Sequence, residues 1–137
     1  MKNDGKTAEV AFEKHWLNRG HVERLRDKKD LMGLNKGLKM ADFAKPADFL
    51  VSSPNDELHY AEVKSTSNPD SFAFAKIQPA QSAAALKEVA RGRGSYIFYI
   101  FSVANGCWYA MNADQYILIL GEGRRSVKFS ELTTWKI

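Results

Sequence analysis

The sequence has 137 residues, of which 45% are apolar and 26% charged, the balance of an ordinary globular domain. A single cysteine, Cys107, excludes an internal disulfide, and no apolar run reaches the roughly 18 residues that a membrane span needs. The chain does not start with the charged and apolar regions of a secretory signal. We therefore expect one domain over residues 1–137, soluble and cytoplasmic, with no membrane contact.

The net charge of +4 is concentrated in one part of the chain. Between Arg19 and Lys45, eight basic residues stand against four acidic ones, so this stretch carries the whole positive excess. It is either a solvated polar segment or a surface that follows phosphates. On the second interpretation the DNA-binding residues are Arg24, Arg26, Lys28, Lys29, Lys36, Lys39 and Lys45.

The first part of the chain predicts a helix followed by an irregular arm. Asp4 is a good N-cap for a helix to about Arg19, and Gly20 is a good stop because glycine tolerates the left-handed conformation. Residues 21–45 are charged, contain glycines and lack a clean period. We expect a basic arm or stalk-like insertion there, without regular structure.

The middle of the chain predicts a hairpin, a helix and a central strand. Strand-forming residues fill 47–51 and 58–64 on either side of a Ser-Ser-Pro-Asn-Asp turn. Pro79 suits the first turn of a helix that ends near Arg91. Residues 96–103 are aromatic, β-branched and uncharged, which is typical of a strand buried on both faces.

The last part of the chain predicts a second hairpin and a small tail. Asn105-Gly106 suits a tight turn into a strand over 107–111, and Asn112 is placed to cap a short helix ending at Tyr116. An edge strand is expected over 126–132. Together these elements predict an α/β (α+β) domain with a mixed central β-sheet flanked by helices.

Glu9 is a charged residue at a position of the first helix where an apolar residue is expected. At 100° per residue it lies in the middle of the apolar stripe of the first helix, between Phe12, Trp16 and Leu17. Because burying an unpaired charge costs several kcal/mol, Glu9 must face a polar pocket, pair with a cation or lie at the rim of the core.

The hairpin carries a second concentration of charge. Glu62 and Lys64 are two residues apart on a strand, so their side chains leave the same face. If Asp48 lies opposite Glu62 or one pleat away, it emerges on that face too. Two carboxylates and an ammonium would then suit Mg²⁺ and a substrate phosphate, which is the chemistry of phosphodiester hydrolysis. The alternative is a cross-strand salt bridge without catalytic function. The histidines His15, His21 and His59 show no metal-ligand spacing.

These residues resemble a known signature. Pro46-Ala47-Asp48 followed by Glu62-Val63-Lys64 is similar to the PD-(D/E)XK nuclease motif. The segments that follow and precede it resemble RecU-type and archaeal-type Holliday junction resolvases: Phe72 and Phe74, then Gln81 at the start of a helix, and upstream Gly5-Lys6-Thr7-Ala8-Glu9. Two positions depart from the RecU pattern, with Ala80 in place of a His and Pro46 in place of a hydroxyl residue.

The resemblance implies a restriction-endonuclease-like core and a Mg²⁺-dependent endodeoxyribonuclease, with Mn²⁺ as a substitute. It implies metal ligands at Asp48, Glu62 and Gln81, a transition-state lysine at Lys64 and a supporting carboxylate at Glu9. The expected activity is symmetric nicking of four-way DNA junctions by a homodimer, in a prokaryotic cell or a phage-infected host. Two alternatives stay open: another PD-(D/E)XK nuclease, of flap, repair or restriction type, and a non-catalytic DNA-binding module.

Overall fold

The computed structural model describes residues 4–25, 45–90 and 95–136. The helices are α1 (Asp4–Leu17), α3 (Pro79–Ala90) and α4 (Ala113–Gly121), with 3₁₀ turns η2 (Phe74–Lys76) and η3 (Phe129–Glu131). The strands are β1 (His21–Arg24), β2 (Phe49–Ser53), β3 (Asp56–Thr66), β4 (Ser71–Ala73), β5 (Tyr96–Ser102), β6 (Cys107–Asn112), β7 (Ser126–Lys128) and β8 (Thr133–Trp135). Within these ranges, no helix is long and apolar enough to cross a membrane.

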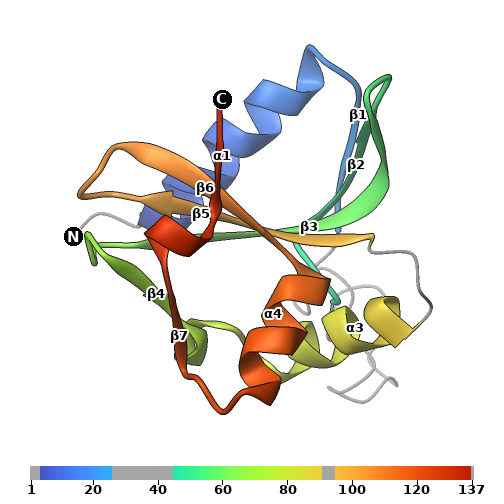
Figure 1. Cartoon of the computed structure of the whole chain (residues 1–137). Coiled ribbons are helices and arrows are strands. Elements are labelled where there is room, and N and C mark those ends of the chain that lie inside the picture. Colours follow the sequence, from blue (N-terminus) through green and yellow to red (C-terminus); the bar gives the residue numbers. More distant parts are fainter. Residues whose placement is uncertain (1–3, 26–44, 91–94, 137) are drawn as a thin grey trace, which may run out of the picture.

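Six strands form one sheet in the order β1-β2-β3-β5-β6-β8, and β4 pairs with β7 in a separate ribbon. The pairing of β3 with β5 is parallel, whereas the other pairings are antiparallel. Helix α3 lies in the crossover between the two parallel strands (Figure 1). The predicted α+β architecture, a mixed central sheet flanked by helices, is confirmed.

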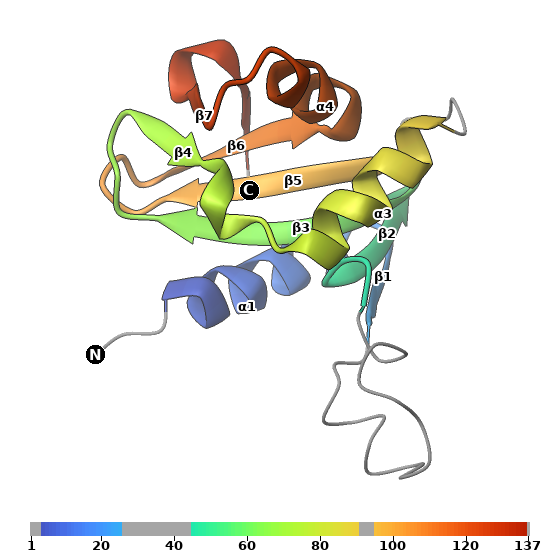
Figure 2. The same cartoon turned by 90° about the horizontal axis from the view of Figure 1, so that it is seen from below.

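The two faces of the sheet are covered by different elements. Helix α1 lies on one face, and α3, α4 and the β4–β7 ribbon lie on the other (Figure 2). Side chains of β5 alternate between two cores, as a strand's period of two requires: Phe98 joins the core with α4, and Tyr99 joins the core with α1. Helix α1 reaches its core through Ala8, Phe12 and Trp16, spaced four residues apart.

The hairpin register is the one that the sequence pattern predicts. Phe49 of β2 lies opposite Ala61 of β3, and continuing this register by one residue places Asp48 level with Glu62. Pairing between β2 and β3 stops there, while β3 continues to Thr66. The second half of β3 therefore has β5 on one side and no β2 pairing on the other.

Three predicted boundaries are wrong. The expected irregular arm begins with a strand, because β1 pairs with β2 along the edge of the sheet. Helix α4 extends to Gly121 instead of ending at Tyr116. Only the start of the expected strand over 126–132 is a strand, and β8 follows it at the sheet edge. Residues 26–44, the rest of the predicted arm, lie outside the described residues.

Gly20 follows α1 as predicted, but for a different reason. Among the described glycines, only Gly106 and Gly123 have positive φ, so Gly20 does not close the helix in a left-handed conformation. A Cβ atom at Gly20 would lie 2.0 Å from the backbone carbonyl oxygen of Ser52. Glycine is required because the chain entering β1 passes directly against β2.

We expect Gly20→Ala to destabilise the protein by about 3 kcal/mol, the upper range of overpacking costs, because the obstructing atom belongs to the backbone. Gly121→Ala is the matched control, since a Cβ there meets nothing within 4 Å. Urea denaturation of both variants measures the difference. Equal midpoints for the two variants would show that β1 does not pack against β2 as closely as described.

The environment of His59 predicts that the free energy of unfolding depends on pH. Its Nδ1 lies 2.7 Å from the carbonyl oxygen of Glu57 and must donate, so Nε2 accepts from the Tyr99 hydroxyl at 2.8 Å. Burial lowers the pKa of His59 from its usual 6.5, so the folded state favours the neutral ring. This stabilisation is present above the unfolded-state pKa and is lost as the pH falls below about 6.5, by at most about 1.4 kcal/mol per pH unit.

The measurement is the unfolding midpoint at pH 7.5 and pH 5.5 for wild type and His59→Gln. Wild type should lose more stability on acidification than the variant, whose side chain does not titrate. An equal loss in both proteins would assign the acid sensitivity to other groups.

Candidate active site

A hollow of about 380 Å³ lies beside the second half of β3, where pairing with β2 has ended. We call it the β3 hollow. Its walls come from α1, the residue before β2, β3, η2 and α3, and are formed by Gly5, Glu9, Asp48, Glu62, Val63, Lys64, Ser65, Lys76 and Gln81. Glu62 and Lys64 lie on the face of β3 that carries α3, as their spacing predicts. The structure thus brings together all five predicted catalytic residues: Glu9, Asp48, Glu62, Lys64 and Gln81.

The Asp48 carboxylate is held by one backbone contact and one side-chain contact. Its Oδ2 accepts a hydrogen bond of 2.9 Å from the backbone N–H of Val63, and its Oδ1 lies 3.2 Å from the Lys45 ammonium. Two residues earlier, the carbonyl oxygen of Pro46 accepts a hydrogen bond from the buried Tyr96 hydroxyl. The carboxylate therefore has a fixed position next to Glu62.

Glu62 is the most unusual ionisable group of the hollow. It is only 2% exposed. Its Oε2 lies 3.1 Å from the Lys64 ammonium and accepts a hydrogen bond of 2.7 Å from the Gln81 amide, whereas its buried Oε1 has no hydrogen-bond partner. Burial and the neighbouring charge of Asp48 raise the pKa of Glu62 to about 8, against the opposing effect of Lys64. Oε1 of Glu62 is therefore without a hydrogen-bond partner and lies near a second carboxylate, so a positive charge at this place would stabilise both.

Gln81 orients Glu62 from the first turn of α3. Its Oε1 accepts a hydrogen bond of 2.9 Å from the backbone N–H of Gln78, which is half of a capping box. Its Nε2 consequently points to Glu62. Ligation of a cation through Oε1 would need the amide to turn over and lose the capping bond, so the ligand role of Gln81 stays a prediction.

Glu9 enters the hollow from the opposite layer. Its carboxylate is half-buried and lies 2.9 Å from one nitrogen of Arg24, whose other nitrogen lies 3.2 Å from Glu13. The Arg24 guanidinium also lies over the Phe49 ring, 4.8 Å from its centre. Burial and Asp48 raise the pKa of Glu9, while the Arg24 hydrogen bond opposes them. The unexpected carboxylate of the apolar stripe therefore has both a cation and a polar pocket.

Two of the predicted DNA-binding residues are engaged elsewhere. Arg24 holds Glu9 and Glu13, and Lys45 pairs with Asp48, so neither is a free cation; their DNA-binding role stays a prediction. The others, Arg26, Lys28, Lys29, Lys36 and Lys39, lie outside the described residues. Lys76 lines the hollow but had no signal in the sequence beyond its place in the segment before α3.

The donor set of the hollow suits a hard divalent cation. In the described part of the chain, no three His, Cys, Asp or Glu side chains gather into a metal site on their own. Asp48 and Glu62 supply two carboxylates, and the unpartnered Oε1 of Glu62 is a free ligand. Mg²⁺ commonly takes one or two carboxylates and fills the rest of its shell with water and phosphate oxygens, so these residues fit it.

We expect Glu9, which Arg24 holds in place, to contribute to the activity of the β3 hollow. Glu9→Gln removes the charge but keeps an oxygen for Arg24, so it should lower activity at the hollow with little change in the thermal midpoint. Glu13→Gln, which touches Arg24 outside the hollow, is the control and should keep its activity. A thermal shift for Glu9→Gln with unchanged activity would give Glu9 a purely structural role.

No protein-family model matches the sequence, and no curated protein matches it either. Among solved structures, this chain is similar to D212, a nuclease from a fusselovirus. The likeness covers 94% of this chain and 82% of that chain, with a TM-score of 0.47 and 8% sequence identity. At these values the likeness carries no weight for the activity of this chain, which has to be judged from the hollow itself.

Proposed function

We propose that this protein is a metal-dependent endodeoxyribonuclease whose active site is the β3 hollow. The observation that carries the proposal is the buried Glu62 carboxylate, which has one unpartnered oxygen and lies beside Asp48 and Lys64. An ordinary ion pair within β3 would explain the contact between Glu62 and Lys64. It does not explain a second carboxylate placed beside the first at a cost in electrostatic repulsion.

Each residue of the hollow has a task in phosphodiester hydrolysis. Asp48 and Glu62 would hold Mg²⁺, with Mn²⁺ as a substitute, and Gln81 and Val63 keep the two carboxylates in place. When bound, the cation supplies a water of lowered pKa and positive charge near the phosphorus. Lys64 presents its ammonium to a phosphate oxygen and stabilises the charge that develops there. Glu9 adds a third carboxylate from the other side of the hollow.

The substrate proposed is a four-way DNA junction, cut by a homodimer in the cytoplasm of a prokaryotic cell or phage-infected host. Support for this finer assignment comes from the sequence resemblance to RecU-type resolvases. Two symmetric nicks need two active sites related by a dyad, and an isologous dimer places them so. Flap and duplex nucleases of the same superfamily share the catalytic residues, so the substrate has to be tested directly.

The test is cleavage of end-labelled DNA: a four-way junction, a flap, a single strand and a linear duplex of matching sequence. Each is incubated with Mg²⁺, with Mn²⁺ or with EDTA. We expect paired symmetric nicks in the junction alone, and none in EDTA. Cutting of the flap or duplex would keep the nuclease and overturn the junction assignment. DNA binding without cleavage of any substrate would overturn the nuclease in favour of a non-catalytic binding module.

A further inference from the structure

Lys76 is the cation of the β3 hollow that is not used to balance a carboxylate. The three carboxylates of the hollow each face another cation, in the pairs Glu9 with Arg24, Asp48 with Lys45 and Glu62 with Lys64. Lys76 is exposed, and among the described residues it has no ion pair or hydrogen bond. Its ammonium is therefore available to an anionic ligand.

The backbone that carries Lys76 is anchored on both sides. Phe74 and Ile77 are buried, and the Ile77 N–H donates a hydrogen bond of 3.0 Å to the carbonyl oxygen of Phe74. Phe74 also donates its N–H to the carbonyl oxygen of Arg125, at 2.9 Å. Lys76 thus projects from a fixed base, and Arg125 lies beside the same turn.

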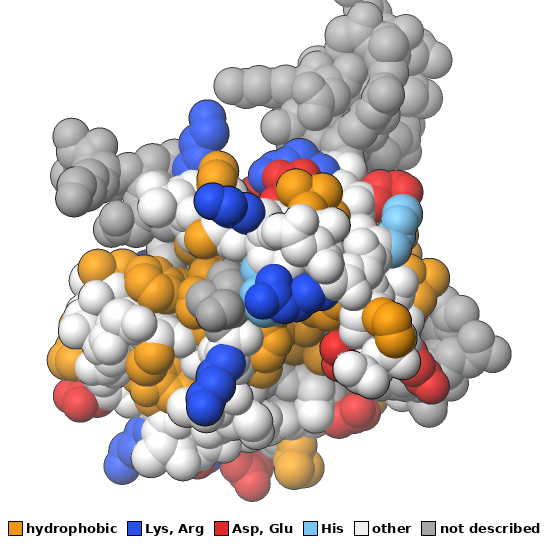
Figure 3. All heavy atoms as spheres, turned by 90° about the horizontal axis from the view of Figure 1, so that it is seen from above, with side chains coloured by type: hydrophobic (Ala, Val, Ile, Leu, Met, Phe, Trp, Pro, Cys, Tyr) orange, Lys and Arg blue, Asp and Glu red, His pale blue; other side chains and the backbone are white. Residues whose placement is uncertain are grey.

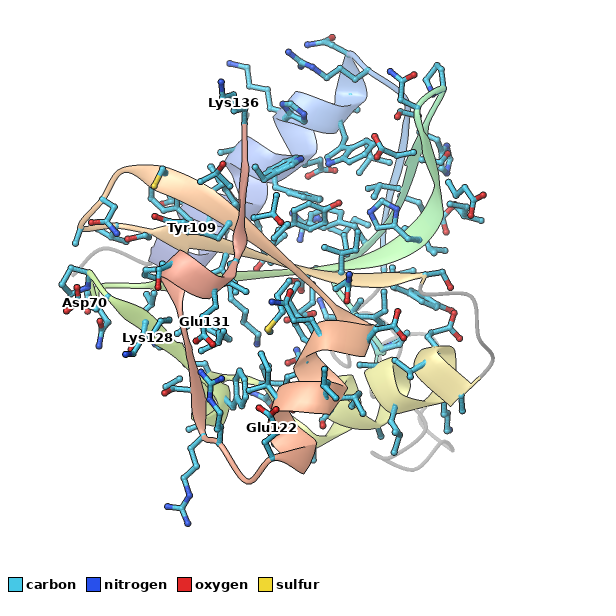
Figure 4. The ribbon with its side chains drawn as sticks, in the orientation of Figure 1. Asp70, Tyr109, Glu122, Lys128, Glu131 and Lys136 are labelled. Carbon is cyan, nitrogen blue, oxygen red and sulfur yellow. The ribbon has the colours of Figure 1, made fainter. Side chains whose placement is uncertain are left out.

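Two more basic residues, Arg125 and Lys128, lie in and next to the β4–β7 ribbon, which leads away from η2. Phe72 and Val127, which lie opposite one another, are buried, so their neighbours Ser71 and Lys128 belong to the outer face. Arg125 and Lys128 are both exposed. In Figure 4, Lys128 lies along the ribbon between Asp70 and Glu131. We call Lys76, Arg125 and Lys128 the basic strip.

The nearby acidic residues leave the strip positive. The Glu131 carboxylate pairs with Arg124, at 2.9 and 2.5 Å, and accepts a hydrogen bond of 2.8 Å from the Lys128 N–H; these contacts, Arg124 first, lower the pKa of Glu131 to about 2. Asp70 lies at the end of the ribbon that is distant from η2, where it and Lys128 line a second hollow of about 790 Å³. Residues 70–76 and 124–131 together carry four basic and two acidic side chains.

We propose that the basic strip binds the sugar–phosphate backbone of the DNA strand that leaves the β3 hollow. Strands rise about 3.4 Å per residue, so the three steps from Ser71 to Phe74 extend the surface roughly 10 Å beyond η2, about three nucleotides along one strand of a duplex. Lys and Arg side chains also occur on the face that carries α1, where Asp and Glu side chains lie beside some of them (Figure 3). The proposal rests on the proposed function for the identity of the ligand.

The experiment measures binding of fluorescein-labelled duplex and four-way junction by anisotropy, in EDTA, over a series of salt concentrations. Lys76→Ala, Arg125→Ala and Lys128→Ala should each weaken binding and lower the slope of log K against log salt by about 0.9 on duplex. Lys76→Arg should retain both affinity and slope. The control is Lys87→Ala, which removes the same charge from an exposed position in the last turn of α3. All four positions are exposed, and thermal midpoints verify folding.

The outcomes separate this proposal from the proposed function. Strip variants that match Lys87→Ala, in a protein whose wild type cleaves DNA, would overturn the strip alone. Reduced slopes in the strip variants, in a protein that cleaves nothing, would support the strip and overturn the nuclease. A wild type that binds no DNA would overturn both.

Discussion

Asp48→Asn is expected to lower Mg²⁺-dependent cleavage by at least about 100-fold, since even outer partners of metal ligands cost about 10- to 100-fold when lost. The substitution keeps the shape of the side chain and an oxygen for the N–H of Val63, so the hairpin should fold unchanged. It removes one of the two carboxylates that hold the cation. It also removes the charge that repels Glu62.

DNA affinity should be retained or increased in Asp48→Asn, because a negative charge disappears from a surface that meets phosphates. Cleavage and binding are measured on the same labelled substrate, with the thermal midpoint as the check on folding. Removal of the metal by EDTA should reduce wild type to the level of the variant. A variant that cleaves at the wild-type rate would exclude Asp48 from the site.

Lys64→Ala is expected to lower the cleavage rate by about 10²- to 10³-fold, the usual cost of removing one preorganised electrostatic contact to a transition state. Its ammonium lies 3.1 Å from Glu62 and is mostly shielded from solvent, so nothing else in the β3 hollow replaces it at that place. The loss should appear in kcat more than in KM, because the contact strengthens as charge develops on the phosphate oxygens.

Two controls separate a catalytic effect of Lys64→Ala from effects on DNA binding and metal binding. Lys76→Ala, on the other wall of the hollow, should raise KM and leave kcat largely unchanged. Glu62 loses a favourable partner when Lys64 is removed, so metal affinity is measured separately by titration with Mn²⁺. A Lys64→Ala protein with the wild-type kcat would show that the Glu62–Lys64 ion pair within β3 has no catalytic role.

The core of the site could be predicted because it depends on local periodicity. Glu62 and Lys64 share a face by the alternation of a strand, and the hairpin turn sets the register that brings Asp48 beside them. Glu9 stood out because the sequence pattern places a charge in an apolar helical stripe, although the buried stripe proves to be Ala8, Phe12 and Trp16, with Glu9 beside it. Each of these inferences needs only residues that lie near one another in the sequence or on one hairpin.

Features that depend on distant packing escaped prediction. Strand β1 has four mostly exposed residues with no apolar pattern, and it forms because β2 offers an edge. Gly20 is required by the carbonyl of Ser52, far along the chain. The sequence alone indicated no partner for Arg24, because its partners lie on α1. Lys76 could be assigned to the β3 hollow only once the position of η2 was known.

The parallel pairing of β3 with β5 affects when, during folding, the β3 hollow is assembled. That pairing requires the whole crossover through η2 and α3 to be in place, and long-range closures of this kind are slow steps in folding. Tyr96 of β5 also holds the segment that carries Asp48. During synthesis, a chain that ends before β5 has every acidic residue of the hollow but lacks the strand beside β3 and the contact of Tyr96 with Pro46. The proposed active site is therefore assembled only late in folding.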